Sequence, residues 1–474
     1  MMDIRGLIAR PAVIVVGALL LGGCATLSPD GGFSTVAEEV RSRGGVDSAW
    51  ARNGSERSAI DARVADLVRR NPLGVEDAVQ VAVLNNRGLQ ASFAELGMAE
   101  ADLVQAGRLP NPHFSMFRAK LGQDYKIEQA LTFNLFSLLT TPIAKEIEQR
   151  RFERARKSIA VEVLRHASET RKAWIAAVAA EETVRYMRRV QGAADAGAEL
   201  ARRMEQAGNW SRLARAREQS LYADATLNLA RAEHAQAAAR ERLTRLMGLW
   251  GEQTGFVLPE RLPDLPDSAA DRPDIERQAL AQRFDVRAAV LDTEAVARNL
   301  GLARATRFVN VLEFGPARVL EGEKSDPYKK GYEISLELPL FDWGTAKVAK
   351  AEAIYGQALD RAAETAINAR SQVREAYRGY RVTHDIAKHY RDEVVPLRKR
   401  ISEENLLRYN GMLIGVFDLL ADTRAQILTV TGYVDALRDF WVAEADLQMA
   451  MIGRVDSPQG PRMSAAQPES AAGH

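Results

Sequence analysis

Few residues in this sequence have the types and the spacing that catalysis or metal binding requires. None of the six histidines stands at metal-ligand spacing from another; His384 and His389, five residues apart, would fall on different faces of a helix. There is no Cys/His pair, no glycine-rich phosphate loop and no Ser-His-Asp order beyond chance. The many carboxylates alternate with Arg and Lys in the pattern of a solvated helix surface. We therefore expect no enzyme, no metal site and no cofactor.

One acidic pair has a spacing that suits an ion pathway. Asp418 and Asp422 are four residues apart, so on a helix they would share one face. If several copies of the chain surrounded one axis, the pair would form acidic rings that attract cations and narrow a pore. A solvated helix face is the simpler alternative.

Cys24 is the only cysteine, so the chain has no internal disulfide. Arg5 and Arg10 precede an apolar run that ends in Leu-Gly-Gly-Cys, which has the features of an export signal. That ending resembles the lipobox of bacterial lipoproteins, in which the cysteine is acylated and becomes the new N-terminus. By this resemblance Cys24 is a lipidation site, and Ala25, rather than an aspartate, implies the outer membrane. An ordinary signal peptide with an incidental cysteine is the alternative.

The elements that must position these residues begin with a strand and a long helix. Residues 332–340 alternate between apolar and polar, which is the period of a strand with one apolar and one wet face. Asp342 and Gly344 end the strand. From Thr345 to Tyr409 apolar residues keep a 4-3 spacing. This predicts a helix about 100 Å long, at roughly 1.5 Å per residue, supercoiled against neighbouring helices.

The same unit occurs earlier in weaker form. Residues 125–136 alternate, and a helical pattern follows from 143 to 205. Leu135-Phe136 matches Leu340-Phe341 at an offset of 205 residues. The chain is therefore interpreted as two copies of one unit.

The repeat divides the chain into six segments: a lipoprotein signal peptide (1–23), a lipid-anchored N-terminal segment that is extended or in short helices (24–72), a first repeat (73–257), a proline-rich linker (258–273), a second repeat (274–453) and a disordered tail (454–474). Each repeat is expected to contain a helix, a hairpin, a long helix and a return helix. The expected ranges are 73–107, 113–118 with 125–135, 143–205 and 212–247, then 274–305, 308–319 with 331–341, 345–409 and 417–453.

The hairpins point to a membrane. Beyond the N-terminus no apolar run reaches the roughly 18 residues of a membrane helix, and the net charge of +1 gives no reason to expect nucleic acid. About four amphipathic strands per chain are too few to close a barrel. Because open sheet edges are not tolerated in a bilayer, the strands must close with those of other chains, with lipid outside and water inside. A long helical coil on such a barrel predicts a conduit that extends into the periplasm.

Three motifs resemble those of TolC-type outer-membrane efflux proteins. Residues 408–420 (RYNGMLIGVFDLL) resemble the helix turn of that family, 337–344 (ELPLFDWG) its strand-to-helix junction, and 106–112 (AGRLPNP) the junction ahead of its first hairpin. Each motif is weak alone. Together, in the right order and with the internal repeat, they extend the resemblance from Leu73 to Gly453.

The resemblance implies a fold and partners. The fold is mostly helical with membrane β-hairpins and two structural repeats. Long coiled-coil helices form a periplasmic α-barrel, and four strands per chain complete a twelve-strand trimeric β-barrel in the outer membrane. The implied partners are two further copies of the chain, a periplasmic adaptor (membrane fusion) protein, an inner-membrane pump of the resistance-nodulation-division type, and outer-membrane lipids.

The family also implies sites at the helix turns, which lie at the periplasmic end, where adaptors bind and the tunnel narrows. Asp418 and Asp422 become candidates for a periplasmic gate. The adaptor-docking tips fall in the first repeat on Gly208, Asn209, Trp210 and Ser211, and in the second on Gly411, Met412, Leu413, Ile414, Gly415, Val416 and Phe417. The apolar residues of the second tip favour contact with a partner, and packing between the two helices is the alternative.

The sequence departs from the family at several positions. Gly usually stands where this chain has Met412, with Gly411 one place earlier, and the counterpart of Asp418 in the first tip is Ala214. An acidic ring is therefore expected from the second tip only. The first strand-to-helix junction, residues 137–142, also lacks the Asp-Trp-Gly of the second. Two other classes of protein remain: a periplasmic adaptor, which should have glycine-rich β segments that this chain lacks, and a lipid-anchored coiled coil without a pore, which leaves the hairpins unexplained.

Overall fold

The computed structural model describes residues 26–308 and 311–455. They form two compact units, each assembled from three separate stretches of chain. The first unit contains residues 26–36, 92–159 and 285–366, and the second contains residues 37–91, 160–284 and 367–455. Long helices pass from one unit into the other, so each unit is described by itself.

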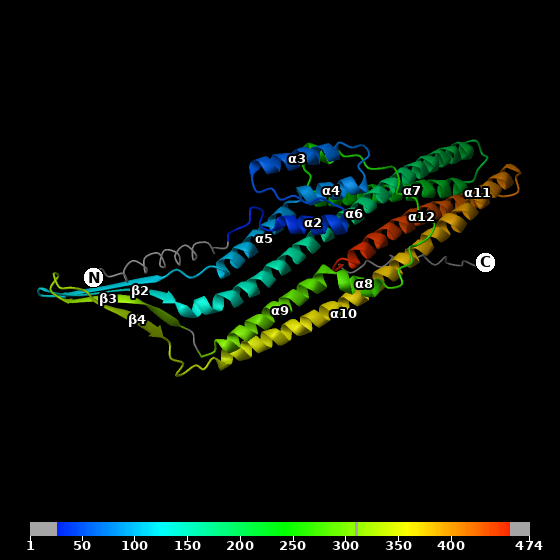
Figure 1. Cartoon of the computed structure of the whole chain (residues 1–474). Helices are drawn as coiled ribbons and strands as arrows, with labels where there is room; N and C mark the ends of the chain where they lie inside the picture. Colours follow the sequence, from blue (N-terminus) through cyan, green and yellow to red (C-terminus); the bar gives the residue numbers. More distant parts are fainter. Residues whose placement is uncertain (1–25, 309–310, 456–474) are drawn as a thin grey trace. The chain divides into compact units, whose positions relative to one another are not determined.

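Helix, hairpin, long helix and return helix follow one another twice along the chain (Figure 1). The elements are α2 (Phe33–Gly44), α3 (Gly54–Val68), α4 (Val75–Asn85), α5 (Arg87–Ala106), β1 (His113–Leu121), β2 (Asp124–Asn134), α6 (Leu135–Gln206), α7 (Arg212–Met247), α8 (Ile275–Gln282), α9 (Phe284–Ala305), β3 (Leu312–Gly322), β4 (Lys329–Leu336), α10 (Thr345–His389), α11 (Val395–Asn410) and α12 (Val416–Ala450). The predicted return helix over 212–247 is confirmed, and the N-terminal segment, expected to be extended or in short helices, contains α2 and α3.

The strands form one antiparallel sheet in the order β1-β2-β3-β4. Gly122, with φ of 61°, closes the first hairpin in a backbone conformation that favours glycine. Gly315 is required for another reason: a Cβ atom there would overlap the carbonyl of Leu131 on the neighbouring strand. The two predicted hairpins are therefore confirmed, and they join into a single sheet.

The predicted helix start is wrong at the first junction, and the predicted strand end is wrong at the second. Strand β2 ends at Asn134 because its side-chain Oδ1 accepts a hydrogen bond from the N–H of Ser137 at 2.7 Å, which starts α6 eight residues before the predicted Ile143. Strand β4 ends at Leu336, short of the predicted residue 341. After Glu337 donates its N–H to the carbonyl of Val311, Pro339 has no N–H to continue the ladder.

Two helices predicted as continuous are each broken in two. Asn86 separates α4 from α5, and its Oδ1 accepts the N–H groups of Gly88 and Leu89, at 2.8 and 3.2 Å, at the start of α5. Arg283 separates α8 from α9 with an extended backbone. Its buried guanidinium donates to the carbonyl of Ala450 and to Gln372, both at 3.0 Å. Polar side chains that satisfy backbone or buried groups cause both breaks.

The long helix predicted from Thr345 to Tyr409 contains one turn of π-helix, Tyr390–Val394, between α10 and α11. Pro396 follows in the first turn of α11 and supplies no N–H, so the wider turn absorbs the missing bond. Gly432 on α12 permits the turn, because a Cβ there would lie 2.8 Å from the hydroxyl of Tyr390.

The helices of the first unit are held by a small apolar cluster and by ion pairs. Leu300, Ala303 and Ala351 are buried between α9 and α10, with Tyr355 against them. Helices α6 and α9 are joined by three ion pairs of 2.7 to 3.0 Å: Arg150–Glu294, Arg154–Asp292 and Arg298–Glu146. Such exposed pairs contribute little to stability, at most about 1 kcal/mol each.

The second unit holds the larger core. Trp174 of α6 is buried and donates its indole N–H to the carbonyl of Leu73 at 3.0 Å. A buried ion pair of 2.9 Å joins Lys172 of α6 to Asp446 of α12. Side chains from both halves of the sequence therefore share this core.

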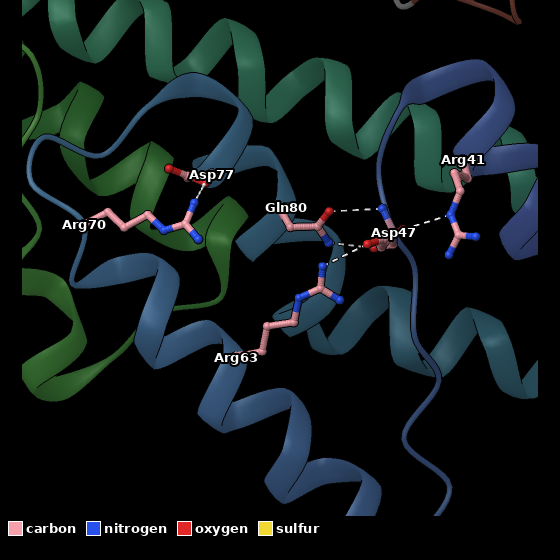
Figure 2. Close-up of polar contacts among 6 residues, drawn as sticks. All are labelled: Arg41, Asp47, Arg63, Arg70, Asp77 and Gln80. Carbon is pink, nitrogen blue, oxygen red and sulfur yellow. Dashed lines mark hydrogen bonds and ion pairs between the residues drawn. The ribbon is translucent and has the colours of Figure 1, made fainter.

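The segment between α2 and α3, also in the second unit, is fastened by polar contacts (Figure 2). Asp47 accepts hydrogen bonds from Arg63 at 2.8 Å and Arg41 at 2.9 Å, which lower the pKa of its carboxyl. Gln80 of α4 donates to the backbone carbonyl of Asp47 at 2.7 Å and accepts its N–H at 3.0 Å. Gln80 therefore bonds both backbone groups of Asp47, as a neighbouring β-strand would.

Candidate functional site: an open amphipathic sheet and two helical turns

The sheet has one apolar face. Residues directly opposite each other in an antiparallel ladder have side chains on the same face, so the pairings assign every residue. Phe133 pairs with Phe314, and Phe314 pairs with Ile334. We call the face that carries these three side chains the apolar face. Five more apolar-face residues lie in the half of the sheet away from the hairpin loops: Phe114, Leu131, Leu312, Tyr332 and Leu336. Several of these side chains are exposed, up to 71% for Tyr332, although they are the residues that water-soluble proteins bury.

The opposite face, which we call the wet face, carries the acids. All five carboxylates of the four strands lie on it: Asp124, Glu128, Glu313, Glu321 and Glu333. Glu128 pairs with Lys126 at 2.9 Å and Glu321 with Lys329 at 3.3 Å. The alternation predicted from sequence is confirmed in β2 and β4, whereas β1 places Phe117 and Leu121 on the wet face.

Both edges of the sheet are open in the described chain, since β1 pairs only with β2 and β4 only with β3. Strand β1 has nine residues, β2 and β3 have eleven and β4 has eight, and β1 and β4 are exposed along their whole length. Unpaired edges beside an apolar face form a template for further strands. No helix in the described residues is long and apolar enough to cross a membrane.

The first helical turn joins α6 to α7 in the second unit. Gly208 takes a left-handed conformation, φ 76°, and its N–H donates to the carbonyl of Glu205 at 2.9 Å. The N–H of Asn209 reaches back to the carbonyl of Met204 at 2.9 Å, which completes a Schellman motif. Ser211 then caps α7 by accepting the N–H of Ala214 at 3.1 Å. Trp210 is half-buried, whereas the other three residues of this predicted tip are exposed.

The second turn joins α11 to α12 and repeats the same bonds 204 residues later. The N–H of Met412 donates to Tyr409 at 2.9 Å and that of Leu413 to Arg408 at 2.8 Å. The left-handed residue is Met412, φ 59°, while Gly411 has φ of −79°. Although this turn has Gly411-Met412 where the family usually has glycine at the second position, it keeps the backbone geometry of the first turn. The methionine takes the strained left-handed position.

The predicted gate residues have different environments. Asp418 is exposed, and its carboxylate accepts the N–H of Gly415 at 3.1 Å, which caps α12. Asp422, one turn later, is 7% exposed within the single chain. The two acids follow each other along α12 as expected, but only Asp418 has a solvent-exposed carboxylate in this chain.

A further acid, Glu218 of α7, was missed by the sequence analysis. The offset of 204 that pairs Gly208 with Met412 also pairs Glu218 with Asp422. Glu218 is 3% exposed, its Oε2 would lie 3.3 Å from a Cβ on Gly197, and burial raises the pKa of its carboxyl, with Arg424 opposing that shift. Extending the repeat register past the turn would have found it.

The turns expose apolar side chains. Met412 is 93% exposed and Leu413 77% exposed, and Leu213 beside the first turn is 60% exposed. Ile414 is half-buried and Gly415 exposed. The side chains of Val416 and Phe417, like Cys24, lie outside the described part of the chain.

Two of the histidines contact backbone carbonyls. His384 is buried with its Nε2 3.0 Å from the carbonyl of Pro266, and the Nε2 of His166 is 2.9 Å from the carbonyl of Leu246. Across residues 26–308 and 311–455, no group of three or more His, Cys, Asp or Glu side chains is placed to hold a metal ion.

Solved structures with the same architecture include three channels or outer-membrane proteins. CusC, which forms a transmembrane channel, matches with a TM-score of 0.68 and 17% identity over 82% of this chain and 94% of CusC. The outer-membrane protein VceC of Vibrio cholerae matches at 0.66 and 16% identity over 80% and 95% of the two chains. The outer-membrane channel CmeC of Campylobacter jejuni matches at 0.64 and 17% identity over 85% and 89%.

The chain has the fold of these outer-membrane channels. The resemblance that its motifs predicted is therefore confirmed at the level of the fold, mostly helical with few strands. Neither a scan of protein-family models nor a search of curated proteins returns a match to the sequence.

Proposed function

We propose that the protein is the outer-membrane channel of a tripartite efflux or export system, passing substrates from an inner-membrane pump and a periplasmic adaptor to the outside. The observation that carries this proposal is the sheet, which has an exposed apolar face and two free edges. Strands of eight to eleven residues suit a bilayer crossing. The fold shared with CusC, VceC and CmeC supports the same conclusion.

The strand number favours a homotrimer. Four strands cannot close on themselves, and two chains would give a barrel of about eight strands, whose interior side chains fill. Three chains give twelve strands, the smallest symmetric closure of this sheet that leaves an aqueous passage. In such a barrel the apolar face meets lipid, the wet face meets water, and β4 of each chain pairs with β1 of the next.

The remaining assignments follow from this arrangement. The long helices would form a periplasmic α-barrel, the turns at Gly208–Ser211 and Gly411–Phe417 would dock the adaptor, and Asp418 with Asp422 would line the gate. The pump would be of the resistance-nodulation-division type. Cys24 would carry the lipid anchor in the outer membrane, and the segment boundaries at 23, 72, 257, 273 and 453 belong to the same proposal.

Cysteine cross-linking tests strand closure between chains. Met116→Cys on β1 combined with Tyr332→Cys on β4 places two thiols on the apolar face. Within one chain β2 and β3 separate them, about 14 Å at roughly 4.8 Å per strand, too far for a disulfide. Oxidation should therefore give covalent dimers and trimers and no larger species. Phe114→Cys and Ile334→Cys, also on the apolar face, extend the scan to other registers of β4 against β1, and variants with one of the two substitutions are the controls.

Single-channel recording completes the test. Trimers that cross-link and conduct in a planar bilayer would support the channel. A non-conducting monomer in which no cysteine pair cross-links would contradict it and favour the alternative, a lipid-anchored periplasmic coiled-coil or adaptor protein without a pore.

A further inference from the structure

Charge is divided unequally between the two faces of the sheet. Of the six Lys and Arg residues on the strands, four lie on the apolar face: Arg118, Lys120, Arg318 and Lys330. No carboxylate lies on that face of the strands, because all five are on the wet face. The strand side chains of the apolar face therefore carry positive charge with no strand carboxylate beside it. On the wet face the acids outnumber the cations.

The four cations are also confined along the strands. Lys120 stands next to the 122–123 turn, and Lys330 is the second residue of β4 after the β3–β4 loop. Arg118 and Arg318 lie in the same loop-side half of their strands. Both hairpin loops are at one end of the antiparallel sheet, so the cations form a band nearer that end than Phe114, Phe133, Phe314 and Tyr332 of the same face.

Tyrosine rings hold the band in place. Lys120 Nζ lies 5.2 Å, and the Arg118 guanidinium carbon 5.5 Å, from the ring centre of Tyr125. The guanidinium of Arg318 lies 4.8 Å from the ring of Tyr328 and donates to Gln129 Oε1 at 2.6 Å. These contacts orient the cations while leaving them exposed. Tyrosine beside Lys or Arg is typical of the level where a membrane protein meets lipid headgroups.

We propose that this cationic band binds the phosphate groups of anionic lipids in the leaflet at the loop end of the sheet. The inference rests on the proposed function, because the apolar face meets lipid only if the sheet is part of a membrane barrel. Phosphate suits the band because guanidinium and ammonium groups bind it strongly and all five strand carboxylates lie on the opposite face. Closing β4 of one chain against β1 of the next would place Lys330 on the same face, and at the same end, as the next chain's Arg118 and Lys120, so the band would encircle the barrel.

A matched pair of variants tests the band. Lys120→Gln with Lys330→Gln removes two cations from the apolar face, on β1 and β4, and Lys126→Gln with Lys329→Gln removes two from the wet face, on β2 and β4. The measurement is binding of phosphatidylglycerol and of phosphatidylcholine to the full-length protein in detergent, by native mass spectrometry. We expect the first variant to bind phosphatidylglycerol roughly 30-fold more weakly, at about tenfold per 1.4 kcal/mol and about 1 kcal/mol per cation, and the second to bind it like the wild type.

The wild-type protein supplies a measurement that needs no variant. It should prefer phosphatidylglycerol over phosphatidylcholine, and 0.5 M salt should weaken that preference, because screening reduces contacts between exposed charges. Equal binding of the two lipids, or equal loss in both variants, would overturn the band. Trimer formation and conductance, recorded on the same samples, separate the two proposals. Trimers that conduct but show no lipid preference would contradict only the band. The absence of conducting trimers in every lipid would contradict the channel.

Discussion

The two helical turns have the same backbone and different side chains. Each ends its helix with a Schellman motif whose bonds correspond at an offset of 204 residues. In the first, glycine takes the left-handed position and serine caps the next helix; in the second, Met412 takes that position and Asp418 reaches back to the N–H of Gly415. An ion pair of 2.7 Å between Arg215 and Glu205 crosses the first turn, where the second has Leu419 and Tyr409.

The comparison shows that one turn geometry can be closed at different energetic cost. Gly208 adopts φ of 76° without a Cβ, whereas Met412 adopts φ of 59° with a side chain that is 93% exposed. A left-handed non-glycine residue costs about 1–2 kcal/mol. The second turn therefore carries strain together with an exposed apolar side chain, which is a combination expected where a turn has a function beyond joining two helices.

Exchanging the left-handed residues should give the largest effect. Gly208→Met should destabilise the first turn by about 1–2 kcal/mol, since nothing lies within 4 Å of a Cβ there and only backbone strain is added. Met412→Gly should have the opposite sign, up to about 1 kcal/mol, because glycine's greater freedom in the unfolded chain offsets part of the gain. Hydrogen exchange of the flanking helix ends measures both, and the unchanged turn is the internal control. If both substitutions changed the stability of their turns in the same direction, backbone strain at the left-handed residue would not be the difference between the turns.

Removing the caps should give the next largest effect. Ser211→Ala removes the acceptor for the N–H of Ala214 and should destabilise the start of α7 by about 1 kcal/mol. Asp418→Ala should do the same for α12, whereas Asp418→Asn keeps an acceptor and should retain most of the stability. Helix-end hydrogen exchange again gives the measurement.

Conductance then distinguishes the cap from the gate. If Asp418 only caps α12, Asp418→Asn should leave ion selectivity unchanged. If its charge lines a gate, Asp418→Asn and Asp418→Ala should reduce cation selectivity to the same extent, although only the alanine variant disturbs the cap.

Sequence periodicity predicted the elements that repeat and missed what single polar residues decide. The turn at Gly208 and the helix over 212–247 were found because a glycine-containing break separates two long helical patterns. The start of α6 was missed because one side chain, Asn134, converts a strand into a helix cap. The π-helical turn was missed because it depends on Pro396 together with Gly432, 36 residues later in sequence and on another helix.

The candidate site was predictable to a similar degree. Alternation identified both strand faces, because a period of two assigns each residue to one side. The pairing of β2 with β3, which joins residues nearly 190 apart, has no local signal. The burial of Asp422 and Glu218 also had none, since it depends on helices that pack from elsewhere in the chain.

Glu218 provides a smaller, pH-dependent test. Burial raises the pKa of its carboxyl, so the folded protein binds this proton more tightly than the unfolded chain does. Its favourable contribution is complete below the unfolded pKa of about 4.3 and is lost as the pH rises through the folded pKa. Glu218→Gln should therefore stabilise α7 at pH 7.5 and make little difference at pH 4, as measured by thermal unfolding. The effect is limited because Arg424 opposes the shift; a variant less stable than wild type at pH 7.5 would contradict this interpretation.

Salt should give the smallest difference between the turns. The Arg215–Glu205 pair spans the first turn with its side chains 46% and 20% exposed, and a pair that solvent reaches is worth at most about 1 kcal/mol. Raising the ionic strength from 0.05 to 0.5 M should therefore lower the free energy of local opening near Gly208 by a few tenths of a kcal/mol, because screening weakens the pair. Hydrogen exchange there should become correspondingly faster. The second turn, with Tyr409 and Leu419 at the equivalent positions, should respond less. Glu205→Gln should make the two turns alike in salt dependence, and an unchanged difference in that variant would mean that other charges cause it.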